Sequence, residues 1–209
     1  MQHRPRSDGP ATELATRSSG PAAVRIRAMR PHEAARVAEL TLAGYDAYGR
    51  MQGDYRRYLA DPARRSTGGE LLVAELDGAV VGTVTFVRPG DAEWEGRREP
   101  DGDSGFRVLA VSPEAEGRGV GRALVLACLE RARELGSRRM VIVSMAWMDR
   151  AHRLYLGLGF RRRPDLDVRF PGGDGVVFDL DLRPDAGEHF APPGPVPDEP
   201  PWYEDAWRG

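Results

Sequence analysis

The chain has 209 residues, 41% of them hydrophobic, which is enough for one domain with a hydrophobic core. All 30 basic residues are arginine and the formal net charge is −2, so neither nucleic acid nor a membrane surface is an expected partner. The lack of lysine excludes a Walker-type phosphate loop, and a single cysteine, Cys128, excludes an intrachain disulfide and favours a cytoplasmic protein.

Composition divides the chain into three parts. Residues 1–22 are polar and rich in Pro, Gly and Ser, and we expect them to be a disordered leader. Residues 184–209 are acidic, and their prolines exclude a helix. The aromatic run WYEDAW in this tail indicates either that it folds back on the domain or that it contacts a second subunit of a homodimer. Residues 23–183 are left as the folded domain.

The first half of this domain predicts helices and antiparallel strands. Asp77-Gly78 lies between two apolar runs, and both residues tolerate the positive φ of a two-residue hairpin turn. A polar loop around Trp94 follows the hairpin. The elements expected in order are a strand at 24–28, a helix opened by Pro31, a short helix that ends before Pro62, and two strands within 70–87.

The second half alternates strands and helices. The helix has a stripe of apolar side chains at helical spacing, which are Val120, Leu124, Cys128, Ala132 and Leu135, and Cys128 is expected to be a buried packing residue. The elements expected in order are a strand at 105–111, a helix at about 119–136, a strand at 139–145, a short helix from Asp149, a strand after Gly159 and a strand at 175–182. This order predicts a mixed α/β fold that is neither a Rossmann repeat nor a barrel.

Three glycines, Gly117, Gly119 and Gly121, stand between a strand and a helix. The first N–H groups of a helix have no intrahelical partner, and glycines let an anion approach them closely. Arg118 and Arg122 alternate with the glycines and can add charge-assisted contacts. These residues predict a phosphate cradle, and the alternative is a tight loop that only allows the strand and the helix to pack closely.

The dinucleotide fingerprint Gly-x-Gly-x-x-Gly does not fit this run. Counted from Gly117, the last position is Arg122, and counted from Gly119 it is Leu124. The run therefore does not predict a dinucleotide-binding site of this kind.

Two motifs resemble those of the GNAT superfamily of N-acetyltransferases. The run VLAVSPEAEGRGVGRAL resembles its coenzyme A motif, with a core that reads Glu116-Gly117-Arg118-Gly119-Val120-Gly121. The later run AHRLYLGLGF, residues 151–160, resembles its second signature, Ala-x-x-Leu-Tyr-x-x-x-Gly-Phe. One helix and one strand separate the two motifs, as in the superfamily. The resemblance extends from Val24 to Leu182.

The resemblance implies a fold and an activity. The fold is a single α/β domain whose mixed, mostly antiparallel sheet is splayed between its fourth and fifth strands and flanked by helices. The activity is transfer of an acetyl group from acetyl-CoA to a primary amine of a small molecule, peptide or protein (EC 2.3.1 class), and the alternative is a non-catalytic acyl-CoA-binding or sensing module. We expect no metal, because the four histidines show no ligand spacing.

The resemblance also implies site residues. The backbone at Leu109, Ala110 and Val111 pairs with the pantetheine arm, and an N–H near Val111 polarises the acetyl carbonyl. Tyr155 protonates the leaving thiolate, although its place on an apolar helix face is equally typical of core packing. The residues expected at the pyrophosphate are Glu116, Gly117, Arg118, Gly119, Val120, Gly121 and Arg122.

Two of the chain's departures from the superfamily pattern concern the site. Glu116 replaces the usual Gln or Arg, and a carboxylate there adds mild repulsion toward phosphate. Gly105 stands where the superfamily often has a glutamate that acts as base. The base therefore stays unassigned, with four carboxylates as candidates: Glu75, Glu93, Glu95 and Asp103.

Aromatic residues are concentrated in the segments that choose the acceptor in this superfamily. They either line a pocket for an amine, by packing or cation–π contact, or cover the core at helical spacing. The residues are Tyr45, Tyr48, Tyr55, Tyr58 and Trp94.

Overall fold

The computed structural model of the protein describes residues 23–48, 53–94, 102–170 and 173–183. The leader and tail expected at 1–22 and 184–209, with the WYEDAW run, lie outside the described residues. No helix in the described part of the chain is long and apolar enough to cross a membrane.

One mixed sheet forms the centre of the domain. Its strand order is β1-β2-β3-β4-β5-β8-β6, with β7 paired to β8 outside this path, and the expected fold class is confirmed. The strands are β1 (Arg25–Ala28), β2 (Glu70–Leu76), β3 (Ala79–Val87), β4 (Ser104–Val111), β5 (Arg139–Met145), β6 (Arg161–Arg162), β7 (Val168–Phe170) and β8 (Gly173–Asp181). The helices are α1 (Ala34–Asp46), α2 (Gly53–Leu59), α3 (Pro62–Gly68), α4 (Val120–Glu134) and α5 (Asp149–Gly157).

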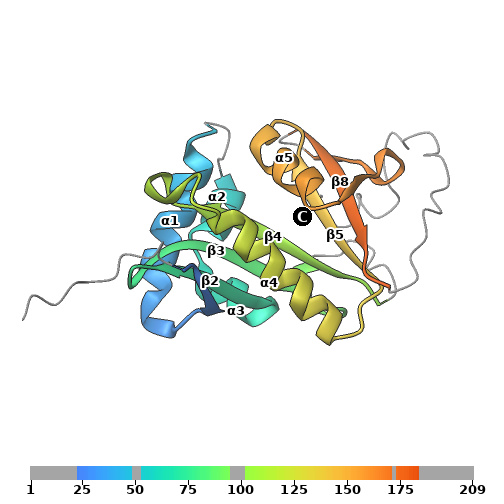
Figure 1. The fold of residues 1–209 in the computed structure, drawn as a ribbon. Coiled ribbons are helices and arrows are strands. Elements are labelled where there is room, and N and C mark those ends of the chain that lie inside the picture. The colour runs from blue at the N-terminus through green and yellow to red at the C-terminus, as the bar shows by residue number, and fades with distance from the viewer. Residues whose placement is uncertain (1–22, 49–52, 95–101, 171–172, 184–209) are drawn as a thin grey trace, which may run out of the picture.

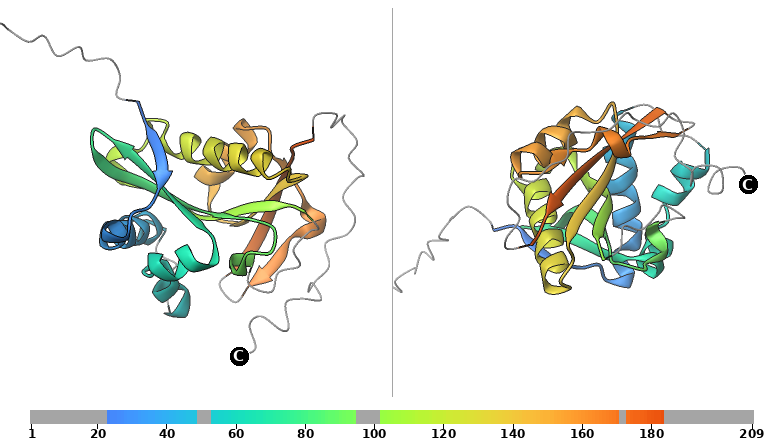
Figure 2. Two further views of the ribbon diagram at one scale, coloured as in Figure 1. Left: turned by 90° about the horizontal axis from the view of Figure 1, so that it is seen from below. Right: turned by 90° about the vertical axis from the view of Figure 1, so that its right-hand side faces the viewer.

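Helices cover both faces of the sheet. α1 and α4 both pack against β3 and β4, and they do so from opposite faces (Figure 2). On the α4 side, Leu124 and Cys128 are fully buried against the sheet, which confirms the packing role expected for Cys128. Leu135 was expected to be part of this buried stripe, but it is not. It is 53% exposed, because α4 ends at Glu134 and the chain turns away at Gly136, whose φ is +69°.

β4 and β5 part from one another soon after they begin. They are parallel neighbours at only two residue pairs, Ser104 with Met140 and Gly105 with Val141. Beyond these pairs β5 continues with β8, to which it is paired along its whole length, and β4 continues with β3 (Figure 1). The splay predicted between the fourth and fifth strands is therefore present.

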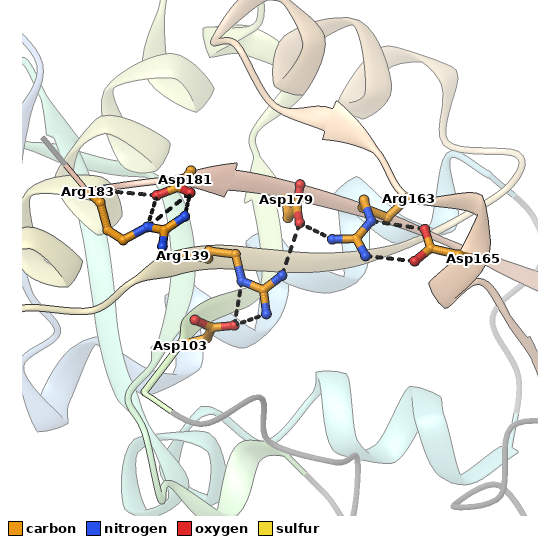
Figure 3. Close-up of polar contacts among 7 residues, drawn as sticks. All are labelled: Asp103, Arg139, Arg163, Asp165, Asp179, Asp181 and Arg183. Atoms are coloured by element: carbon orange, nitrogen blue, oxygen red, sulfur yellow. Dashed lines mark hydrogen bonds and ion pairs between the residues drawn. The ribbon is translucent and has the colours of Figure 1, made fainter. Parts of the chain in front are cut away.

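A chain of alternating charges lies at the closed end of the splay (Figure 3). Asp103, which is 1% exposed and directly precedes β4, accepts hydrogen bonds from Arg139 of β5, with Nε at 3.0 Å. Arg139 also lies 3.5 Å from Asp179 of β8, and Asp179 is paired with Arg163 at 2.6 Å. Burial raises the pKa of Asp103, and the bond from Arg139 opposes that rise. Arg139 thus joins three strands where β4 and β5 are still paired.

The hairpin prediction is confirmed and one helix was missed. Asp77 and Gly78 connect β2 and β3 with φ values of +52° and +80°. Pro62 was expected to follow the end of a helix, but it opens a further helix, α3. The Asp61 side chain caps α3 by accepting a hydrogen bond from the N–H of Arg64 at 2.9 Å, and Pro62 occupies a first-turn position that needs no N–H.

Replacing Arg139 with leucine tests the clamp at the closed end. Arg139→Leu leaves Asp103 buried without its cation, so we expect the free energy of unfolding to fall by about 3 kcal/mol. Arg183→Leu is the matched control, because it removes a pair with Asp181 in which the arginine side chain is 56% exposed, and it should change stability little. Urea unfolding measures both, and equal losses for the two variants would contradict the clamp.

Candidate active site

A cavity of about 1090 Å³ opens where β4 and β5 separate. Its walls come from both parted strands, from the N-terminal end of α4, and from α1, α2 and α5. The volume lies just above the ~300–1,000 Å³ range of small-molecule sites. Two substrates, or one long ligand with a second small one, can therefore meet in it.

The glycine run forms one end of this cavity. Gly117 and Gly119 both have left-handed backbone conformations, with φ values of +73° and +78°. The N–H of Ala123, bonded to the Gly119 carbonyl at 3.0 Å, makes the first intrahelical bond of α4, so the N–H groups of residues 120–122 precede the helical ladder. A Cβ at Gly117 or Gly119 would meet no protein atom within 4 Å. The glycines therefore keep bare donors beside open space, as an anion cradle requires.

The cavity brings together most of the residues expected at the site. Arg118 alone among them is turned elsewhere, toward Asp77 in the β2–β3 turn at 3.3 Å, and it does not line the cavity. The expected residues that do line it are Leu109, Ala110, Val111, Glu116, Gly117, Gly119, Val120, Gly121, Arg122 and Tyr155.

β4, the strand beside the gap, contains a bulge in its pairing with β3 that the sequence did not reveal. Thr83 of β3 pairs with Ala110, and Thr85 pairs with Arg107, so two β4 residues face the single residue between the threonines. Within the bulge Val108 has a φ of +53°, which is rare for a β-branched residue. The bulge re-aims the β4 backbone at the point where β4 leaves β5. No local signal predicts it, because valine normally avoids this conformation.

Tyr155 lies on α5 between the core and the cavity. Its ring contacts Phe106, Phe160 and Phe178 at centroid distances of 5.7 to 5.9 Å, and only 4% of the residue is exposed. Burial raises the pKa of the Tyr155 hydroxyl well above its ordinary value. The ring therefore has the packing role that its apolar helix face predicted, while the residue also lines the cavity.

None of the three candidate bases in the described part of the chain lines the cavity. Asp103 is paired with Arg139, and Glu75 is paired with Arg27 at 2.8 Å on the β1–β2 side of the sheet. Glu93 is buried, accepts a hydrogen bond from the Tyr58 hydroxyl and lies 3.5 Å from an Nη atom of Arg107. The remaining candidate, Glu95, lies outside the described residues.

Gly105 lies at the closed end of the splay. It pairs with Val141, and a Cβ there would lie 2.9 Å from both the Val141 carbonyl oxygen and the Trp94 ring. Any larger residue would clash at this position, so the glycine is required by the packing of Trp94 against β4.

The tyrosines of the first helices divide between pocket and core. Tyr45, Tyr48 and Tyr55 line the cavity, while Tyr58 packs in the core beside Leu59, in a cluster to which the buried Tyr45 also belongs. Burial raises the pKa of both Tyr45 and Tyr48, so their hydroxyls stay protonated at neutral pH. The pocket and core alternatives thus each hold for part of the set. Trp94 does not line the cavity, and its indole N–H donates to the Arg88 carbonyl at 2.7 Å.

The structure adds residues that the sequence did not single out. Arg107, Met148, Arg150 and Phe170 also line the cavity. Arg150, at the start of α5, forms an ion pair with Glu116. Its position three residues after Trp147 gave no sign of this partner, because the pair joins segments separated by a helix and a strand. In the described part of the chain, no group of three or more His, Cys, Asp or Glu side chains is placed to hold a metal ion.

Solved structures with the same fold come from several bacteria. A GNAT-family acetyltransferase from Staphylococcus aureus matches 77% of this chain and all of its own at a TM-score of 0.61 and 18% identity. A GNAT-family acetyltransferase from Brucella melitensis, in complex with acetyl-CoA, matches 84% of this chain and 94% of its own at a TM-score of 0.53 and 22% identity. Identities this low establish the fold alone.

Curated relatives are more similar in sequence but longer. The mycothiol acetyltransferase of Cellulomonas flavigena is 33% identical over 153 residues, which are 68% of this chain and 42% of that protein. The mycothiol acetyltransferase of Sanguibacter keddieii is 33% identical over 157 residues, 70% of this chain and 48% of that protein. The chain therefore spans less than half the length of these relatives.

The family assignment comes from the domain itself. The model of the acetyltransferase (GNAT) family matches residues 35–160, more than half of the chain, from the second residue of α1 to the last residue of the second signature. This range contains the parted strands, the glycine cradle and Tyr155. The chain belongs to the GNAT family of acetyltransferases.

Proposed function

We propose that the protein transfers the acetyl group of acetyl-CoA to a primary amine by direct attack of the amine on the thioester. The observation that supports this most strongly is the single cavity wall formed by the cradle, the free edge of β4 and Tyr155. An anion site, a strand edge and a proton donor are the three parts that binding and cleaving a long, phosphorylated thioester requires.

The cofactor fits the cavity in a defined direction. The N–H groups of Gly117 and of residues 119–122 bind the diphosphate, because the open space beside the glycines admits phosphate oxygens without contact with a Cβ. The free edge of β4 at Leu109 and Val111 binds the pantetheine arm as an added strand would bind. This direction brings the thioester toward Tyr155, in the gap between β4 and β5.

Once the thioester is bound, its cleavage needs little catalytic help from the protein. Acetyl-CoA supplies an acyl carbon bonded to a thiolate leaving group, whose thiol has a pKa of about 8.5. A backbone N–H near Val111 donates to the carbonyl oxygen as negative charge develops on it. The amine nitrogen forms the new bond to that carbon, and the C–S bond breaks. Tyr155 gives its proton to the departing sulfur, and the nitrogen loses a proton that restores the tyrosine.

The amine enters from the side of α1 and α2. Tyr45, Tyr48 and Tyr55 line that part of the cavity with aromatic surface and hydroxyl groups. An amine must be neutral to attack, so an α-amino group with a pKa of about 8 needs less help than a lysine-type amine with a pKa of about 10.4. Because the curated relatives are named mycothiol acetyltransferases, des-acetyl mycothiol is one acceptor to examine.

A panel of amines tests the activity. We expect CoA thiol release from acetyl-CoA with at least one class among amino acid amides, polyamines, aminoglycosides, peptide N-termini and des-acetyl mycothiol. Mass spectrometry of the acceptor should show one added acetyl group. Tight binding of acetyl-CoA without turnover for every amine would contradict the proposal and support the acyl-CoA-sensing alternative.

Tyr155→Phe tests the proton donor. It removes only the hydroxyl, so the packing against Phe106 and Phe178 stays and acetyl-CoA affinity should change little. We expect kcat to fall about 10²-fold, at the low end for general acid catalysis because the thiolate leaves readily. The raised pKa keeps the hydroxyl protonated, so the wild-type rate should show no loss from tyrosine ionisation up to about pH 10. An unchanged kcat in the variant would remove Tyr155 from this role.

A further inference from the structure

An ion pair spans the cavity at its phosphate-binding end. Glu116 lies just before the first cradle glycine, and Arg150 is the second residue of α5. Both side chains line the cavity, and both are accessible, with 44% and 68% of their surface exposed. The pair therefore connects the loop before α4 with the start of α5.

The arginines around the cradle differ in where they point. Arg118 lies inside the glycine run but turns to Asp77, and it does not line the cavity. Arg122 and Arg150 do line it. Glu116 thus holds at the cavity an arginine that comes from a distant part of the chain, while the arginine next to it in the sequence is directed away.

A carboxylate at an anion site would repel phosphate if it stood alone. The positive charge of Arg150 neutralises the Glu116 carboxylate. The Arg150 guanidinium has five N–H donors, and its contact with Glu116 is made by Nη1. The remaining donors can bind a second anion without release of the first.

We propose that Arg150 binds a phosphate of CoA and that Glu116 is the positioning residue that keeps the Arg150 guanidinium at the cradle. This inference rests on the proposed use of the cavity for acetyl-CoA. It reverses the role expected for Glu116 from sequence, since the carboxylate then increases cofactor affinity through Arg150 where simple repulsion would decrease it.

Titration calorimetry with CoA tests the proposal on five variants and the wild type. Arg150→Gln should weaken CoA binding about 10-fold, as loss of a charge-assisted bond to phosphate does, and Arg150→Lys should recover part of the loss. Glu116→Gln should weaken binding about 3-fold, and adding it to Arg150→Gln should cause no further loss, because Glu116 favours binding only through Arg150. The matched control, Arg118→Gln, should stay within about 2-fold, because Arg118 is an exposed arginine of the same loop that faces away.

Truncated ligands identify the group that Arg150 binds. The loss in Arg150→Gln should disappear with pantetheine, which has no phosphate. If the loss persists with dephospho-CoA, Arg150 binds the diphosphate, and if it disappears there, Arg150 binds the 3′-phosphate; either result supports the proposal. A loss that is as large with pantetheine as with CoA would overturn it.

Three other outcomes would also overturn the inference. They are tighter CoA binding by Glu116→Gln, additive losses in the double variant, and equal affinities of Arg150→Gln and Arg118→Gln. If the wild-type protein binds CoA and the variants give one of these three outcomes, only this inference fails and the proposed function stands. A wild-type protein that does not bind CoA removes the proposed function, and this inference with it. Circular dichroism should show that all variants keep the fold, because the replaced side chains are accessible.

Discussion

The separation of β4 from β5 is the constraint on which the site depends. The two strands share only two residue pairs, while on their other edges β5 stays paired with β8 along its whole length and β4 with β3. The β4 edge beyond Gly105 therefore faces an opening, and the bulge at Val108 re-aims the backbone there. Arg139 stabilises the closed end by contacting Asp103 and Asp179, so the opening has a defined origin. The cavity, the cradle and Tyr155 all lie along the gap that results.

Charge and burial vary in a consistent way along that gap. The cradle end is exposed and carries Arg122 and the Glu116–Arg150 pair, which suits a solvated, multiply charged group. Toward the closed end the walls become aromatic, and burial raises the pKa of Tyr155. A phosphorylated carrier with an uncharged thioester end has this same change of polarity along its length. The fit between the two supports the proposed direction of cofactor binding.

Much of the fold could be predicted because its signals are local. A few neighbouring residues predict each of three features: the turn at Asp77-Gly78, the glycine run and the 139–145 strand. The two motifs shared with the family predicted the splay and most of the residues that line the cavity. The rest depends on contacts between distant segments. The Arg150 partner, the Arg139 clamp and the conformation of Val108 are set by tertiary packing, and α3 was missed because proline opens helices as readily as it follows them. Gly105, first interpreted as a missing base, is a packing requirement beside Trp94.

The central claim is that bare backbone donors at the start of α4 bind the diphosphate while the β4 edge binds the pantetheine arm. Amide NMR shifts during a CoA titration measure this most directly, because each N–H reports its own hydrogen bond. The account predicts that the largest shifts occur at Gly117, at residues 119–122 and at β4 residues 108–111, on both sides of the gap. Saturable CoA binding that leaves these amides unshifted, with the changes concentrated elsewhere, would contradict it.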